Sequence, residues 1–358
     1  MEGTGPVAIV TGSSTGIGYQ TALGLALKGY TVVIATRNRQ AARDAVLRIK
    51  REVEKRSHST ESKSFLDGGS VHTGTATDML LDTSSLASVK SFADGFPPSL
   101  ASRLHVLVLN AGISGLGLAR EERKTVDSHE RVFATNFLGH FYLAQQMLES
   151  LKLTASAAPS FTHGRPPVRI VTLASVTHRL VPSDPPDWNA VLTGMSKKGS
   201  QYAYSKLAAL LLAGELNRGP LVGSGVTAIA VNPGAVNSDI WRNITACTAC
   251  WFRPFMRLTF LTPEQGAATS IAAASESKLG STPLDSPNVE HTPTLYLSPY
   301  ASPQWMQRAG GWTALVGDLL GLFRGANVML PTPLALDAKC AKALWLACET
   351  AIAAKQGL

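Results

Sequence analysis

Val7-Ala8-Ile9-Val10-Thr11-Gly12-Ser13-Ser14-Thr15-Gly16-Ile17-Gly18 is the stretch that decides the fold of this chain. Its apolar start predicts a short buried strand, and residues 16–28 have the spacing of a helix. Glycines between them let the backbone turn tightly, and a helix N-terminus supplies N–H donors to a pyrophosphate. An ordinary glycine-rich turn is the alternative, but the order strand, loop, helix favours a dinucleotide-binding loop. The predicted cofactor contacts here are Gly12, Ser14, Thr15, Gly16, Ile17 and Gly18.

The same alternation continues along the chain. Further strands are predicted near 31–35, 74–81, 105–109, 168–174 and 226–231, and helices near 38–56, 86–96, 130–153 and 202–217. Short apolar strands that alternate with helices imply a parallel sheet covered on both faces. The sequence therefore predicts an α/β fold: a single Rossmann-type, doubly wound parallel sheet with helices on both faces. No internal repeat is visible, and we expect one domain over residues 1–358.

The residue that follows the second strand bears on the choice of cofactor. An acidic residue there would bind the ribose 2′-hydroxyl of NAD, whereas this chain has Arg37. A guanidinium can pair with a 2′-phosphate, so the sequence favours NADP (NADPH) and makes NAD less likely than NADP. Asp82, after the third strand, is predicted to bind the adenine edge, with a helix cap as the alternative.

Composition excludes several other classes of function. The chain has 358 residues and a formal charge of +8, from 33 basic and 25 acidic residues. The densest basic stretch, 48–56, also holds two glutamates and is interpreted as the solvated end of a helix, so no nucleic-acid partner is expected. Cys247 and Cys250 lack a second pair, so no metal site is predicted. The few cysteines indicate a reducing compartment, and no run is long enough to span a bilayer.

Tyr202 and Lys206 lie one helical turn apart, so their side chains can face the same way. A neighbouring ammonium favours the phenolate and is expected to lower the tyrosine pKa. Such a tyrosine can act as an acid or base in carbonyl and alcohol chemistry. Tyr204 is a rival phenol, but it is rotated by about 200° around the helix from Lys206 and should face elsewhere.

Four further segments surround this pair in a fixed order. Asn110-Ala111-Gly112 closes the fourth strand, Asn136 lies within a helix, and Ser175 ends the fifth strand. Each of these has an ordinary alternative, since an Asn can be a packing residue and a Ser can be a helix cap. After the sixth strand come the remaining predicted cofactor contacts, which are Pro233, Gly234, Val236 and Ser238.

Together these motifs resemble the short-chain dehydrogenase/reductase family over about residues 7–276. The patterns around Arg37-Asn38, Asn136-Phe137-Leu138-Gly139-His140 and Tyr202-Ala203-Tyr204-Ser205-Lys206 are similar to the retinol dehydrogenase-like branch. Gly16-Ile17-Gly18-Tyr19 is similar to the polyprenol dehydrogenase members of that branch.

The resemblance implies roles for four catalytic residues. Tyr202 would exchange the proton with the substrate oxygen, and Ser175 would hydrogen-bond that oxygen. Lys206 would lower the Tyr202 pKa and hold the nicotinamide ribose, and Asn136 would anchor a water in a proton relay to Lys206. The long segment between Ser175 and Tyr202, which includes Trp188, would line the substrate mouth.

The C-terminal part departs from the family pattern. Residues 294–297 are predicted as the last strand, about 300–331 as an insertion, and 337–354 as a helix. An aromatic cluster follows Gly234: Trp241, Trp251, Phe252, Phe255, Met256, Phe260 and Leu261. It suggests a lipophilic substrate, such as a retinoid, steroid or polyprenoid. With residues 312–323 it also suggests peripheral membrane contact, and a packed core is the alternative.

The resulting hypothesis is an NADP(H)-dependent oxidoreductase of a carbonyl or alcohol. A protochlorophyllide-type reductase of a C=C bond shares the Tyr/Lys pair and is one rival. A non-catalytic cofactor-binding scaffold is the other. We expect a location on the cytoplasmic side, with the protein soluble or peripherally membrane-associated, and a homodimer is a further hypothesis.

Overall fold

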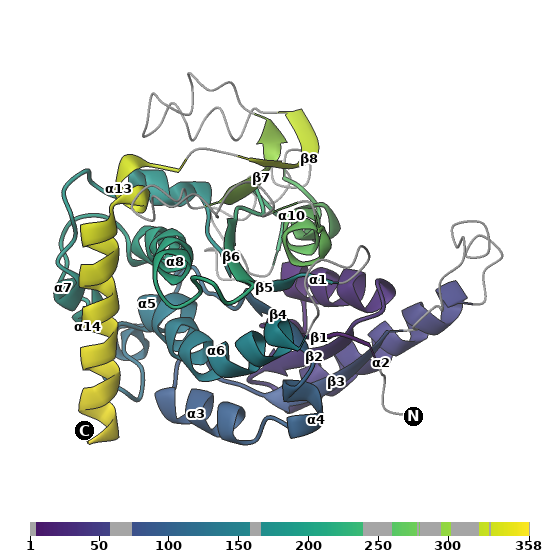
Figure 1. The fold of residues 1–358 in the computed structure, drawn as a ribbon. Helices are drawn as coiled ribbons and strands as arrows, with labels where there is room; N and C mark the ends of the chain where they lie inside the picture. Colours follow the sequence, from purple (N-terminus) through teal and green to yellow (C-terminus); the bar gives the residue numbers. More distant parts are fainter. Residues whose placement is uncertain are drawn as a thin grey trace.

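A computed structural model of the chain describes residues 5–57, 74–157, 166–238, 260–277, 279, 295–301, 322–328 and 331–357. Eight described strands form one sheet in the order β3-β2-β1-β4-β5-β6-β7-β8 (Figure 1). The first seven run parallel, and β8 pairs antiparallel with β7. The strands are β1 (Val7–Thr11), β2 (Thr31–Thr36), β3 (Thr75–Leu80), β4 (Leu104–Leu109), β5 (Val168–Leu173), β6 (Val226–Val231), β7 (Tyr296–Ala301) and β8 (Leu322–Val328).

Helices cover both faces of this sheet, as Figure 1 shows. The α-helices are α1 (Gly16–Leu27), α2 (Arg39–Ser57), α3 (Leu86–Asp94), α4 (Pro98–Ala101), α5 (Arg131–Phe133), α6 (Gly139–Ser156), α7 (Trp188–Thr193), α8 (Gln201–Arg218), α10 (Pro263–Ser275), α13 (Pro333–Leu336) and α14 (Ala338–Gln356). Two 3-10 turns, η2 (Glu121–Arg123) and η4 (Val176–Leu180), and one π-helical turn, η3 (Ala134–Leu138), complete the described helical elements.

The central strands are mostly apolar because both of their faces are buried, whereas the edge strand β3 is partly exposed. All residues of β1, β2 and β5 are buried, as expected for the centre of a parallel sheet. One core cluster lies between the sheet and α3, α6 and α8, and the other lies between the sheet and α1, α2 and α10. The predicted doubly wound α/β fold is confirmed.

Two predictions about individual elements are wrong in part. The helix predicted over 130–153 is divided, because α5 passes through the π-helical turn η3 before α6 begins at Gly139. The strand at 294–297 was predicted to be the last, but β7 starts at Tyr296 and β8 follows it. Strand β8 lies inside the predicted insertion at 300–331, whose residues 302–321 and 329–330 fall outside the described part. Antiparallel pairing does not require a crossover helix, so the alternation of strands and helices used for prediction does not point to β8.

The C-terminal helix α14 packs against α8 and α6, at the side of the molecule seen at the left of Figure 1. Asp337 caps its start by accepting hydrogen bonds from the amides of Lys339 and Cys340. The Trp345 ring meets the Phe141 ring edge-on with centroids 4.8 Å apart. Helix α14 therefore supports α8 from the side away from the sheet. No helix in the described ranges is both long and apolar enough to cross a bilayer.

Candidate active site

The predicted site residues meet at one edge of the sheet because they follow the carboxyl ends of parallel strands. Thr11 ends β1, Asn110 follows β4, Ser175 follows β5, and Pro233 lies two residues beyond β6. In an open parallel sheet this edge is where ligands bind, beside the point at which the strand order reverses. Here the order reverses between β1 and β4, so the site is centred there.

The loop from β1 to α1 has the backbone that the sequence predicted. Gly12 and Gly16 adopt φ of 63° and 57°, in the left-handed region that favours glycine. At Gly18, an added Cβ would lie 2.4 Å from Asn110 Nδ2 and 2.5 Å from Gly12 O, so a side chain does not fit. These glycines leave the loop backbone bare for the close approach of a pyrophosphate, which fits a dinucleotide cofactor.

Asn110 and Thr11 fasten the ends of β1 and β4 together. Asn110 Nδ2 donates to Thr11 O at 2.7 Å, and the Thr11 hydroxyl accepts from the amides of Asn110 and Ala111 at 2.8 and 2.9 Å. The Asn110 side chain therefore holds the start of the glycine-rich loop.

Helix α2 holds the same loop from the outside. Arg48 Nη2 donates to Ser14 O at 2.9 Å, and its guanidinium lies 4.2 Å from the centroid of the Tyr19 ring. The interpretation of residues 48–56 as the solvated end of a helix agrees with the exposure of Arg48, which makes these two contacts in addition. The two partners of Arg48, Ser14 and Tyr19, lie 34 and 29 positions away in the sequence, and helical periodicity does not reveal such contacts.

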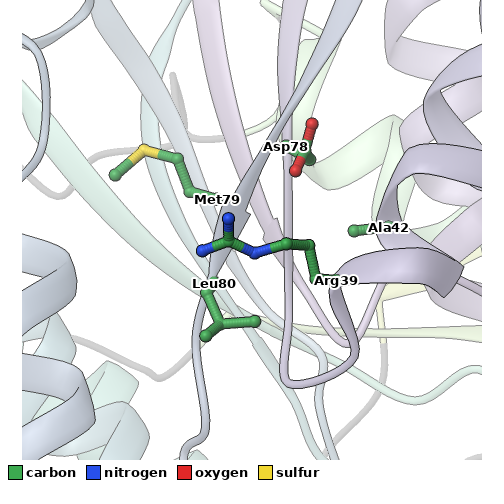
Figure 2. A pocket seen from close by; sticks show the side chains of 5 residues that line it. All are labelled: Arg39, Ala42, Asp78, Met79 and Leu80. Carbon is green, nitrogen blue, oxygen red and sulfur yellow. The ribbon is translucent and has the colours of Figure 1, made fainter.

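The end of β2 presents two exposed arginines. Arg37 follows the strand, and Arg39 begins α2. In the described part of the chain no ion pair involves either guanidinium. Arg39 also lines a pocket of about 190 Å³ between α2 and β3, where its side chain extends between Asp78 and Leu80 (Figure 2). Because three strands separate β3 from β5, this pocket lies roughly 19 Å or more from Ser175.

Asp82 is not the cap of α3, as its alternative interpretation had it, because the N-cap of that helix is Ser85. Asp82 Oδ1 accepts from the amide and the hydroxyl of Ser84, at 2.9 and 2.7 Å, and so shapes the turn that leads to α3. Its predicted contact with an adenine edge stays a prediction.

The loop after β6 closes over the glycine-rich loop. Asn232 is fully buried, and its Oδ1 accepts from the Gly234 amide at 3.1 Å while its Nδ2 donates to Ser298 Oγ at 3.2 Å. Val236 packs against Ile17, and the Ser238 Cβ lies 3.7 Å from the place of a Cβ at Gly16. The predicted residues of β1–α1 and of the β6 loop are thus brought together.

Tyr202 and Ser175 share a hydrogen bond between β5 and α8. Ser200 caps α8 by accepting from the Ala203 amide at 3.1 Å, which fixes where the helix starts and therefore which way Tyr202 points. Burial raises the pKa of Tyr202 to about 12, and the hydrogen bond with Ser175 acts to lower it. The net lowering of the Tyr202 pKa that the sequence predicted is therefore wrong, because desolvation of the phenolate outweighs the causes that lower the pKa.

Lys206 is buried below the Tyr202 ring. Its Nζ donates to Leu173 O at 2.8 Å and lies 5.4 Å from the centroid of that ring. Burial lowers the Lys206 pKa to about 8. An ammonium with this pKa is still mostly charged at pH 7 and lies next to the phenol, where it can stabilise a developing phenolate.

Tyr204 faces away from this pair, as its helical phase predicts. Its hydroxyl donates to Lys198 O, and its ring lies edge-on to Trp188 with centroids 6.4 Å apart. Trp188 itself is 3% exposed and also packs against Phe133. Its prediction as a residue of the substrate mouth is wrong, because the tryptophan fills the core beneath α8.

Asn136 lies in η3, next to α8. Its Oδ1 accepts from the Ile113 amide at 2.8 Å, and its Nδ2 donates to Ile113 O at 3.0 Å and to Ser205 Oγ at 3.1 Å. Its side chain thus joins the segment after β4 to the helix that carries Tyr202 and Lys206. The water relay through Asn136 stays a prediction.

Three buried residues that make hydrogen bonds within this site were not predicted from the sequence. Asn232 fixes the β6 loop, His140 contacts Thr11 and Asn136, and His178 contacts Ser175 O at 2.7 Å. His178 and His140 were each within four residues of a predicted catalytic residue, which was the available signal. Of the predicted aromatic cluster, residues 241–256 lie outside the described residues, while Leu261 is buried and pairs with Val236.

The fold and this edge define a Rossmann-type α/β protein whose glycine-rich loop fits a dinucleotide, with Ser175, Tyr202 and Lys206 near the carboxyl end of β5. Residues 6–63 match the family model described as short chain dehydrogenase. Human polyprenol dehydrogenase is 35% identical over 269 residues, which cover 75% of this chain and 72% of that protein. Mouse retinol dehydrogenase 12 is 35% identical over 274 residues, with 75% and 73% covered. The chain therefore belongs to the short-chain dehydrogenase family of oxidoreductases, in its retinol dehydrogenase-like branch, as the motifs predicted.

Solved structures agree with this assignment. The NADP active-site complex of RhlG from Pseudomonas aeruginosa is 26% identical, with a TM-score of 0.53 over 76% of this chain and 90% of that one. An uncharacterised protein from Mycobacterium paratuberculosis shares the fold with a TM-score of 0.59 over 97% and 93%, at 24% identity.

Proposed function

We propose that this chain is an NADP(H)-dependent oxidoreductase that interconverts a carbonyl and an alcohol on a lipophilic molecule. The observation that carries the proposal is the arrangement of Ser175, Tyr202 and Lys206 at the sheet edge. The Tyr202 hydroxyl is hydrogen-bonded to Ser175, and the buried Lys206 ammonium lies beneath the same ring.

The chain's own groups account for the proton in such a reaction. A bound nicotinamide supplies or accepts the hydride. During reduction, Tyr202 donates its proton to the substrate oxygen, which Ser175 holds with a hydrogen bond. The high pKa of Tyr202 keeps the phenol protonated before the reaction. Lys206 then stabilises the phenolate that forms, because its charge lies within the same buried region. During oxidation the same groups act in reverse.

The loop and the end of β2 support NADP(H) as the cofactor. Gly12, Gly16 and Gly18 leave room for a pyrophosphate at the start of α1. Arg37 is exposed just beyond β2, where a carboxylate would otherwise select the 2′-hydroxyl of NAD. Arg39 lies beside it and adds a second positive charge. A 2′-phosphate near these guanidiniums would gain charge-assisted hydrogen bonds, which makes NAD the weaker ligand.

The names of the relatives support a lipophilic substrate. Two of them are a polyprenol dehydrogenase and a retinol dehydrogenase, and their names denote long apolar alcohols. The aromatic residues between positions 241 and 260 of the sequence would suit a pocket for an apolar substrate of this kind. We therefore infer a retinoid, a steroid or a polyprenoid as the substrate class.

The test is a screen of the purified full-length chain for NADPH oxidation with retinal, steroid ketones, polyprenals and small carbonyl compounds. The matching alcohols are supplied with NADP for the reverse reaction. Turnover with an apolar carbonyl and NADPH is expected. Tight NADPH binding without turnover on any compound would identify a cofactor-binding scaffold and contradict the proposal.

Two tyrosine variants separate chemistry from folding. Tyr202→Phe should lower kcat by about 10²- to 10⁴-fold, because it removes the proton donor, while NADPH affinity stays the same. Tyr204→Phe is the matched control on the same helix. It loses the hydrogen bonds of the Tyr204 hydroxyl with Lys198 O and Ser196 Oγ, both away from the predicted acid/base pair, and should keep its activity. Equal activity of the two variants would refute the assignment of Tyr202.

A further inference from the structure

His140 lies near the start of α6 and is 3% exposed. Its Nε2 lies 2.8 Å from the hydroxyl of Thr11, which is 129 positions away in the sequence. Its Nδ1 lies 2.9 Å from the backbone oxygen of Asn136. Both ring nitrogens of this buried histidine therefore contact residues of the active-site edge.

The hydrogen-bond partners determine which nitrogen carries the proton. Asn136 O can only accept, so Nδ1 must be the protonated nitrogen. Nε2 of the neutral ring is then an acceptor and needs a donor. The Thr11 hydroxyl already accepts from two backbone amides, so it can only donate to His140. Its hydrogen has two acceptors in reach, His140 Nε2 at 2.8 Å and Val108 O at 3.4 Å, and the shorter contact places it on Nε2. The ring is thus held as a neutral Nδ1–H tautomer with one donor and one acceptor contact.

The electrostatic surroundings favour the same state. Burial lowers the His140 pKa to about 4, and the nearby Lys206 ammonium acts in the same direction. The charged group that acts on His140 is therefore a cation, which opposes a second positive charge on the ring. At neutral pH His140 is therefore expected to be uncharged, with Nδ1 as the donor to Asn136 O and Nε2 as the acceptor from the Thr11 hydroxyl.

The two contacts of His140 lead to different halves of the site. Through Thr11 the ring fixes the amides of Asn110 and Ala111 and the start of the glycine-rich loop. Through the backbone oxygen of Asn136 the ring fixes η3. The side-chain amide of Asn136 in turn donates to Ser205 Oγ on α8, the helix that carries Tyr202 and Lys206. One imidazole is thus the shared support of the cofactor loop and the acid/base helix.

We propose that His140 is a positioning residue, which sets the cofactor loop through Thr11 and the acid/base helix through the backbone of Asn136. The inference deepens the proposed function and rests on it. It assigns His140 two separable effects, one on cofactor affinity and one on turnover, because its two nitrogens serve two different segments.

Two amide variants divide these effects. In His140→Asn the side-chain amide can occupy the place of Nδ1 and donate to Asn136 O, but it is too short to reach Thr11. In His140→Gln the longer side chain can accept from Thr11, but it no longer presents a donor at the Nδ1 position. His140→Leu removes both contacts. His105→Asn is the control, because His105 lies at the opposite end of β4 and contacts Arg103 O.

The readouts are the NADPH dissociation constant, from quenching of protein fluorescence, and kcat on the best substrate of the screen. His140→Asn should weaken NADPH binding about tenfold with kcat within twofold, as expected for one lost hydrogen bond. His140→Gln should lower kcat about tenfold with NADPH affinity unchanged. His140→Leu should show both losses, and His105→Asn neither. Thermal unfolding of each variant identifies any that fails to fold.

A second measurement needs no substitution. The ¹⁵N chemical shifts of the imidazole in wild-type protein at pH 7 should report a neutral ring protonated on Nδ1. An Nε2–H tautomer or an imidazolium would overturn the proposal. Folded Asn and Gln variants with equal effects on both parameters, or with no effect, would also overturn it by showing a packing role only.

Failure of the proposed function would look different. In that case wild-type protein would lack NADPH turnover on every compound in the screen, whatever the variants do. NADPH binding by wild-type protein and His140→Asn would still test the link through Thr11.

Discussion

The cofactor half and the acid/base half of the site differ in the chemical groups that form them. The cofactor half, at the ends of β1, β2 and β4, consists of bare backbone at glycines and of exposed arginines. The acid/base half, at η3, β5 and α8, consists of buried or half-buried side chains that bond to one another or to the backbone. Lys206, for example, is 6% exposed and donates to Leu173 O.

This difference indicates which physical effect governs each half of the site. An exposed arginine keeps its ordinary charge and acts through charge and reach, so its substitution should change affinity by modest factors. A buried group acts through desolvation and fixed geometry, so its substitution should change rate or pH dependence more strongly. Each prediction below tests that division.

Among changes that leave Tyr202 in place, Lys206→Met should have the largest effect in the acid/base half. Loss of the ammonium beneath the Tyr202 ring should lower kcat by about 10²-fold, the size seen when one electrostatic contact to a developing charge is removed. Wild-type activity in the reduction direction should fall as the pH rises through about 8, because Lys206 loses its charge there. The pH profile of kcat for Lys206→Met should lack that fall. A fall at the same pH in the variant would assign it to another group.

In the cofactor half, Gly18→Ala should have the strongest effect. The added methyl would overlap Asn110 Nδ2 and Gly12 O, and relieving the overlap should cost about 1–3 kcal/mol. NADPH binding should weaken by roughly ten- to a hundredfold while the pH profile of kcat keeps its shape. Binding titrations and a thermal melt measure the two consequences. Gly223→Ala is a useful control, because that glycine has no atom within 4 Å of the added methyl, although its positive φ adds some strain.

A smaller effect is expected from Arg37→Ser. It should reduce the preference for NADPH over NADH by roughly tenfold, since one charge-assisted hydrogen bond to the 2′-phosphate is lost. NADH affinity should not change. Arg51→Ser, an exposed arginine farther along α2, serves as the control. An unchanged preference in Arg37→Ser would refute the role of Arg37, and the same measurement on Arg39→Ser would show whether the neighbouring guanidinium acts instead.

A change at His178 should have the smallest effect on activity but a clear effect on stability. Burial lowers the pKa of His178 to about 3 from the ordinary value of 6.5, and its Nε2 accepts from the Thr332 amide at 3.4 Å. Between these two pH values the unfolded chain binds a proton that the folded chain does not. Stability is therefore present above about pH 6.5 and is lost as the pH falls toward 3.

Melting temperatures of wild-type protein and His178→Asn between pH 7 and 4 measure this loss. The variant should be less stable at pH 7 but should show a shallower decline on acidification. Parallel curves for the two proteins would contradict the assignment to His178.

Much of the cofactor half could be predicted because its signals are local. Gly12, Gly16 and Gly18 have their meaning within one turn of chain, and Arg37 is located by the end of its strand. Tyr202 and Tyr204 are distinguished by helical phase alone. The roles of Asn136, His140 and Arg48 could not be predicted in the same way, because their partners lie 23 to 129 positions away. Strand β8 was missed for a related reason, since it lies within the segment predicted as an insertion and is defined by its antiparallel pairing with β7.

By itself, then, the sequence determined the alternation of strands and helices, the glycine loop, and the face of α8 that carries Tyr202 and Lys206. These features depend on residue type and on the period of regular backbone, which act over a few residues. Only the tertiary structure decided that the Tyr202 pKa rises, that the Lys206 pKa falls, and that His140 joins the two halves of the site. The reason is that burial and hydrogen-bond pairing depend on what distant segments place around a group, and a linear pattern does not contain that information.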